Sequence, residues 1–237
     1  MNRGDIIERF RQENPEITTN VASDAVLQSW CEIGNAETAV RARLIKGSTT
    51  FAATADEETY NLVSRISKFY DIDELPGGGV AYNDKRLNLT TPAQLDANRP
   101  SWRTASSGTP NSYYRRNENI YLVVPPSGTS DITIDAVLLA DDLDDDSKEP
   151  FNGLANLKPF HYSLVLYLKM RAFGGKVKKK DTSMTAKEEY EDYIDWIKKE
   201  NQRGIYQEIR IRPPTNYRST SRRRLLFRTE YKPDISV

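Results

Sequence analysis

The hydrophobic period of the sequence changes twice along the chain, and this double change most constrains the fold. Apolar residues recur at helical spacing before residue 47 and again from Leu157 on, whereas short alternating segments fill the region between. Helices separated by an inserted β unit must pack on each other to share a core. The sequence therefore predicts an α+β protein: a helical bundle with an inserted small β subdomain and an extended C-terminal arm.

Two helices are expected at the N-terminal end. The first spans about 5–13 and ends before Pro15; its apolar stripe is Ile6, Ile7 and Phe10. The second spans about 23–44 with Ser23 as its N-cap. Its apolar side chains are expected on one buried face, and the stripe is Val26, Leu27, Trp30, Ile33 and Glu37.

The middle of the chain, 47–140, has the character of a β insertion. Period-two segments predict strands at 49–54, 64–72, 120–124 and 132–138. Asn83 and Asp84 form a tight turn, and residues 76–79 a flexible one. Residues 91–114 carry three prolines and are expected to be irregular, with one helical turn at 92–98.

Helical spacing then returns. The stripe of the next helix is Leu157, Phe160, His161, Leu164, Val165, Leu168 and Ala172, and Gly174 with Gly175 ends it. A last helix opens at Ser183 or Thr185, and its packed face is Tyr190, Tyr193, Ile194 and Ile197. The domain organisation predicted is 1–46, N-terminal helices; 47–140, β insertion; 141–202, acidic linker and C-terminal helices; and 203–237, extended arm.

Composition limits the chemistry that the chain can perform. Its 237 residues, 38% of them hydrophobic, suffice for a core, and no signal peptide or membrane span is evident, so a cytosolic protein is expected. One cysteine and one histidine exclude an internal disulfide and a zinc site, and no cofactor is expected. His161 is interpreted as a buried structural residue rather than a general base, and Cys31 as a small core residue. No enzyme is predicted.

Two further binding motifs are incomplete. Residues 77–79 are a glycine run with no Gly-Lys-Ser or Gly-Lys-Thr after it, which disfavours nucleotide binding. Asp142, Asp144 and Asp146 have the alternate spacing of a calcium loop, but Ser147 replaces the turn glycine and Gly153 the bidentate glutamate. A solvated acidic linker is the favoured interpretation, and a hydrolase built on these acids lacks a partner base.

The final segment, 203–237, carries nine Lys or Arg against three acids and has alternating apolar positions but no core. A strand that cannot bury its apolar face needs a sheet edge or groove on another chain, so strand addition to the portal or a neighbouring subunit is the hypothesis. A disordered solubilising tail is the alternative. The candidate contact residues are Ile209, Ile211, Tyr217, Arg222, Arg223, Arg224, Leu225, Phe227 and Tyr231.

A basic loop raises the question of nucleic acid. Its residues are Lys176, Lys178, Lys179 and Lys180. Clustered cations release counterions from phosphate, but the whole chain has zero formal charge, and a solvated loop between helices is the favoured interpretation. If these lysines face DNA, we expect DNA passing through an assembly without sequence-specific contacts. A nucleic-acid-binding accessory protein that uses this loop and the tail is the alternative function.

The order of these features resembles the head-to-tail adaptor (connector) proteins of tailed bacteriophages. The residues that carry the resemblance are Ser29-Trp30, Tyr60-Asn61-Leu62, 82–87, 91–96, 99–103, Gly108-Thr109-Pro110 before Tyr113-Tyr114, 120–126 and the helix at 160–173. It covers roughly 5–200; the glycine loop at 77–79 and the tail past Gly204 depart from shorter members of the family.

The resemblance implies a structural virion protein in the neck between capsid and tail, assembled in the host cytoplasm. It implies a homo-oligomeric ring, typically of twelve subunits, around the DNA channel. The partners implied are the portal protein, a downstream tail or neck protein and the passing genomic DNA, with no membrane. C-terminal arms would reach onto the portal.

Overall fold

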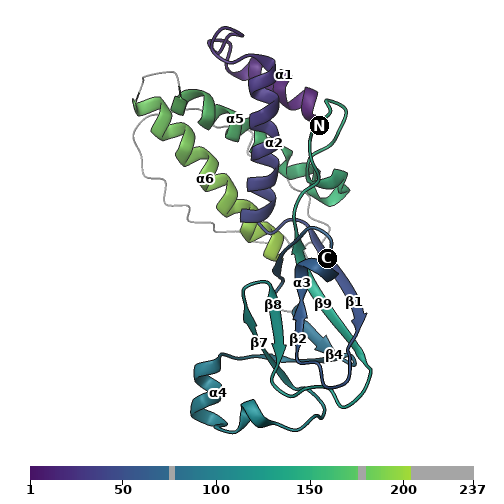
Figure 1. The fold of residues 1–237 in the computed structure, drawn as a ribbon. Helices are drawn as coiled ribbons and strands as arrows, with labels where there is room; N and C mark the ends of the chain where they lie inside the picture. The colour runs from purple at the N-terminus through teal and green to yellow at the C-terminus, as the bar shows by residue number, and fades with distance from the viewer. Residues whose placement is uncertain (75–77, 176–179, 204–237) are drawn as a thin grey trace, which may run out of the picture.

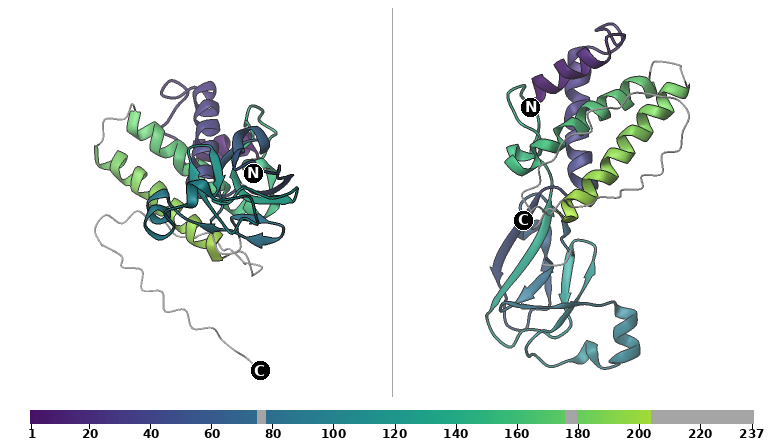
Figure 2. Two further views of the ribbon diagram at one scale, coloured as in Figure 1. Left: turned by 60° about the horizontal axis from the view of Figure 1, so that its bottom comes forward. Right: turned by 180° about the vertical axis from the view of Figure 1, so that it is seen from behind.

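The computed structural model describes residues 1–74, 78–175 and 180–203, and within them the chain forms two parts stacked along one long axis (Figure 1, Figure 2). The helical part contains α1, α2, α5 and α6. The β part contains the strands together with α3 and α4. The chain passes into the β part after α2 and returns after β9, so the helices on both sides of the insertion meet. The predicted α+β class is confirmed.

Four helices build the helical part. They are α1 (Arg3–Glu13), α2 (Asp24–Arg41), α5 (Tyr162–Gly175) and α6 (Lys180–Arg203). A capping box begins α1: the Asn2 side chain accepts a hydrogen bond from the Asp5 amide, and the Asp5 carboxylate accepts one from the Asn2 amide. Two 3₁₀ segments, η2 (Phe151–Gly153) and η3 (Ala155–His161), lead into α5.

The core of the helical part surrounds α5, which packs against α1, α2 and α6. All seven residues of the stripe predicted from Leu157 to Ala172 are buried, as are the four of the packed face on α6. Helices α2 and α5 approach closely at Gly34, where a Cβ atom would lie 2.7 Å from Cδ1 of Tyr167. The aromatic ring of Tyr167 therefore occupies the space that any larger residue at position 34 would need.

The predicted N-cap of α2 is confirmed, because Ser23 occupies it, although its side chain makes no capping hydrogen bond. Two other helix predictions are wrong in detail. Ile33 is 46% exposed, because α2 turns a face of small residues that includes Cys31 and Gly34 toward α5. Helix α6 begins at Lys180, so both predicted starts, Ser183 and Thr185, lie inside the helix.

The β part contains two sheets in the described residues. The first has the order β1-β9-β4-β5, with β3 also paired to β9; its strands are β1 (Lys46–Ala52), β3 (Phe69–Ile72), β4 (Val80–Tyr82), β5 (Lys85–Arg86) and β9 (Asp131–Leu138). The second has the order β2-β8-β7-β6; its strands are β2 (Thr59–Asn61), β6 (Asn88–Leu89), β7 (Ser112–Arg116) and β8 (Asn119–Leu122). Among these strands, only β6 and β7 pair in parallel.

A second apolar core lies between these strands. Its fully buried members include Tyr60, Leu62, Ile72, Ile120, Leu122, Ile132 and Ile134. The strand predicted at 64–72 is only half right: α3 (Leu62–Arg65) occupies its start, capped by the Asn61 side chain, which accepts from the Ser64 amide at 2.9 Å. Residues 66–68 form a turn, and only Phe69–Ile72 form a strand, β3. Asn61 is the last residue of β2 and the N-cap of α3, so its side chain marks the point where the strand gives way to a helical turn.

The excursion at 91–114 is more ordered than predicted. Its helical piece is α4 (Pro92–Asn98), with a capping box from Thr91 and Gln94, as the prediction placed it. A 3₁₀ turn, η1 (Trp102–Thr104), follows, and the segment ends in β7, which was not predicted. The turn at Asn83 and Asp84 is confirmed: both residues have positive φ, at 48° and 61°.

Candidate assembly interface

The two parts meet at a waist, formed by the residues after α2 and by β3. The Asp71 carboxylate accepts hydrogen bonds from Arg43, which follows α2, and from Arg115 on β7. Beside it, Lys46 Nζ lies 2.9 Å from Oδ2 of Asp73, which is 6% exposed. Truncating one partner of such a half-buried network leaves the other charge without compensation. The contact of Arg43 ties the segment after α2 to β3, and the other two contacts lie within the β part.

The last helix ends at this waist. The Asn201 side-chain amide donates to the carbonyl oxygens of Ala42 and Arg43, at 3.0 and 2.9 Å. Helix α6 therefore ends beside the residues that lead into β1. The nine candidate contact residues of the arm lie outside the described residues, as do Lys176, Lys178 and Lys179. Lys180 begins α6, and its side chain is also outside the described part.

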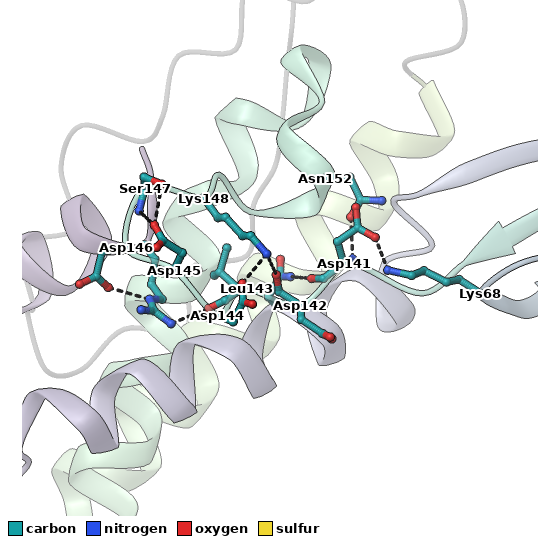
Figure 3. A network of polar contacts seen from close by, with 12 residues as sticks. Lys68, Asp141, Asp142, Leu143, Asp144, Asp145, Asp146, Ser147, Lys148 and Asn152 are labelled. Carbon is teal, nitrogen blue, oxygen red and sulfur yellow. Dashed lines mark hydrogen bonds and ion pairs between the residues drawn. The ribbon is translucent and has the colours of Figure 1, made fainter.

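The acidic segment, residues 141–149, connects β9 with the helical part (Figure 3). Lys68 pairs with the Asp141 carboxylate, and the Asp141 amide donates to Oδ1 of Asn152 at 2.7 Å. Further along, Lys148 pairs with Asp144. The hydrogen bond from Lys148 holds the pKa of the Asp144 carboxyl below its usual range. The segment thus neutralises part of its own charge.

A buried anchor holds the acidic segment to α1. Leu143 is 1% exposed, and its carbonyl oxygen accepts from the Arg3 guanidinium at 2.7 Å (Figure 3). Arg3 also donates to Asp146 at 2.7 Å. Most of the carboxylates face solvent, as the linker interpretation predicted. Across residues 1–74, 78–175 and 180–203, no group of three or more Asp, Glu, His or Cys side chains is placed to hold a metal ion.

His161 and Cys31 both lie in the core of the helical part, as predicted. The His161 ring is fully buried, and its Nδ1 donates to the Met1 carbonyl oxygen at 2.8 Å. Burial, followed by the positive Met1 amino group, lowers the pKa of His161 to about 4. Burial raises the pKa of the Cys31 thiol to about 12. At neutral pH the imidazole is uncharged and the thiol is protonated, which suits packing.

An aromatic cluster caps the far end of the β part, and sequence reasoning missed it. Tyr114 and Tyr121 stack with ring centroids 4.8 Å apart, and Trp102 meets Tyr114 edge-on at 5.6 Å. Asp96 on α4 accepts from Trp102 Nε1 at 2.8 Å and from Arg103 at 2.6 Å. Figure 1 shows α4 at the end of the β part that is distant from the helices. The pairing of Tyr114 with Tyr121 across two strands would have revealed the cluster, but the strand β7 was not predicted.

Three features stand out in the described residues: the ion pairs of the waist, an aromatic tip formed by Trp102, Tyr114 and Tyr121, and a last helix that ends at the waist. A family model described as SU10 adaptor protein matches residues 1–216, and the chain belongs to this family of bacteriophage head-to-tail adaptors. No curated protein matches the chain.

Family membership confirms the resemblance drawn from the sequence and assigns the chain a structural role in phage tail assembly. The family is not a known enzyme family. None of the helices in the described ranges is both long enough and apolar enough to span a bilayer. The candidate contact residues of the arm and of the basic loop remain predictions.

Proposed function

We propose that this chain is the subunit of an adaptor ring in the virion neck, which docks beneath the portal and joins the capsid vertex to the tail around the DNA channel. The ring is a homo-oligomer, taken as a dodecamer, and it forms in the host cytoplasm. The observation that carries this proposal is the family match, because it runs through both parts and into the first residues of the arm.

In this proposal the four segments have different tasks. The helical part, residues 1–46 and 141–202, packs side by side around the ring, and the β part, 47–140, presents the aromatic tip to the downstream tail or neck protein. The arm, 203–237, binds the portal or a neighbouring subunit. The position of the end of α6 supports this division, because Asn201 there contacts Ala42 and Arg43, which connect the two parts.

Passing DNA is the remaining proposed contact. Lys176, Lys178, Lys179 and Lys180 would face the channel as a sequence-independent cationic lining. Affinity of the free protein for random duplex DNA, measured against salt, separates this from the alternative of a nucleic-acid-binding accessory protein. Weak binding is expected; tight binding with a steep negative slope in log affinity would favour the accessory protein instead.

Deletion of residues 204–237 tests the arm. Both cores lie between Ile6 and Ile197, so the shortened chain is expected to fold with an unchanged circular dichroism spectrum. Its affinity for the cognate portal, measured by sedimentation or biolayer interferometry, should fall at least about tenfold, because several contacts are lost together. Substitution of Lys176, Lys178 and Lys179 by Gln is the control that leaves portal binding intact. Unchanged affinity of the shortened chain would refute the role of the arm.

A further inference from the structure

Strand β1 is an edge of the first sheet. It pairs with β9 alone, in the register from Lys46↔Val137 to Ala52↔Asp131. Figure 1 shows β1 at the margin of the β part. Strand β9, in contrast, has β1 on one side and β3 and β4 on the other. One side of β1 therefore has no strand partner in the described residues.

The register shows which backbone groups point outward. The Leu138 amide donates to the Ile45 carbonyl at 2.9 Å, and the Ala53 amide donates to the Ser130 carbonyl at 2.7 Å. Hydrogen-bonded and non-hydrogen-bonded pairs alternate in an antiparallel ladder, so odd-numbered residues from 45 to 53 bond to β9. The N–H and C=O groups that point away belong to Lys46, Ser48, Thr50 and Ala52.

This edge lacks the features by which proteins prevent unwanted pairing. Residues 47–53 contain no proline and no charged side chain, and Ser48, Thr50 and Ala52 expose only small side chains. No hydrogen bond from the described residues reaches the outward groups of these three residues. A seven-residue edge of this kind is a ready template for another strand. Its conformation is already fixed by the β9 ladder.

We infer that the free edge of β1 accepts residues 225–231, from the arm of a second copy of this chain, as an added β-strand. The inference deepens the proposed ring and rests on it. Leu225, Phe227, Thr229 and Tyr231 recur at every second position and would continue the apolar side of the sheet, where Phe51 is partly buried. Seven residues of period two match the seven residues of β1.

The charges around the two strands are complementary. On the solvent face of the sheet, Asp131 and Asp135 lie on β9, opposite Ala52 and Ser48 of β1. The other face of the arm strand contains Leu226, Arg228 and Glu230 and has no net charge, so the positive charge comes from the flanking residues, Arg222, Arg223, Arg224 and Lys232 against Asp234. An added strand lies about 5 Å from β1 and about 10 Å from β9, so these opposite charges come within roughly one Debye length. Ser48 on β1 is neutral, so it does not repel the charged side chains of an added strand on this face.

The length of the chain allows the strand to reach a second copy. Helix α6 ends beside Ala42 and Arg43, which lie only a few residues from the start of β1. Residues 204–224 intervene before the strand, and 21 extended residues reach about 70 Å. A return to its own β1 would need only a fraction of that length. Donation in one direction gives each subunit one strand given and one received, which is a head-to-tail contact that can close a ring.

Two full-length variants test the inference by complementation. Ser48→Pro removes an outward N–H and blocks the edge without touching the β9 ladder, while Ser48→Ala keeps the N–H and is its matched control. Phe227→Asp disables the arm strand, with Phe227→Leu as its control. Each disabled variant alone should self-associate at least about tenfold more weakly than the unsubstituted protein. Their mixture should form 1:1 complexes, since one chain supplies the arm and the other the edge.

Amide hydrogen exchange on the unsubstituted protein supplies the second measurement. Residues 225–231 should gain protection as concentration rises, together with the amides of Ser48 and Thr50. Protection that does not depend on concentration would mean that the arm binds its own chain. Rapid exchange at every concentration would mean that the arm makes no such contact. Either result overturns the inference, as would undiminished self-association of Ser48→Pro. Portal affinity is measured separately. If Ser48→Pro loses self-association but still binds the portal, the result supports strand addition between subunits. If deletion of the arm leaves portal affinity unchanged, the result refutes only the proposed docking of the arm to the portal.

Discussion

Lowering the pH from 7 to 5 is expected to destabilise the protein through His161. Its ordinary pKa of 6.5 falls to about 4 in the folded state, because burial and then the Met1 amino group disfavour the charged ring. Glu149 acts in the opposite direction and Lys158 in the same direction as Met1, both more weakly. A base with a lowered folded pKa contributes stability above its unfolded pKa and loses it as pH falls toward the folded pKa. The loss is therefore expected between pH 6.5 and pH 4.

The magnitude follows from the two pKa values. At pH 5 the unfolded chain binds a proton at position 161 and the folded chain does not, which gives a loss of about 2 kcal/mol relative to pH 7. Urea unfolding at both pH values measures it. His161→Gln is the control, because its amide can still donate to the Met1 carbonyl but does not titrate. Between pH 7 and pH 5, the free energy of unfolding of His161→Gln should fall by about 2 kcal/mol less than that of the unsubstituted protein. Equal falls in the two proteins would refute the reasoning.

Two further substitutions test packing and the waist. Tyr190→Phe removes the hydroxyl that lies 3.0 Å from the buried Thr38 hydroxyl, and should lower the free energy of unfolding by about 1–3 kcal/mol in thermal or urea unfolding. A second change, Thr38→Val, should restore much of that loss. Additive losses in the double variant would contradict this. Asn201→Ala should speed amide exchange in the last turn of α6 while leaving the melting temperature nearly unchanged, because Asn201 holds only the end of this helix. Lys199→Ala, at an exposed position, should alter neither quantity. A large fall in the melting temperature of Asn201→Ala would contradict this local role.

Sequence reasoning worked where a long element has one apolar face. The stripe on α5 and the packed face of α6 were predicted residue by residue, because a 3.6-residue period sustained over several turns is specific to an amphipathic helix. On α2 it was right for Leu27, which is buried, and wrong for Ile33, which is exposed, while Trp30 is partly buried against the core. The close approach of Tyr167 selects the side with Gly34 instead, and that preference depends on a neighbour more than 130 residues away.

Short strands were the second source of error. The β2 and β6 strands span three and two residues, too few for a period to be visible. Their pairing with β8 and β7 makes them strands, and no local pattern reports it. The aromatic tip was missed for the same reason, since Trp102, Tyr114 and Tyr121 meet only when the sheet forms.

The sequence by itself determined the α+β class, the helices on both sides of a β insertion, the structural roles of His161 and Cys31, and the family resemblance that the comparison confirmed. These follow from periodicity, inventory and local motifs, which are properties of neighbouring residues. The tertiary structure decided which side of α2 is buried, how Asp71 braces the waist, and that β1 is left with an open edge. Each of these depends on contacts between residues far apart in the chain, and a linear pattern does not contain them.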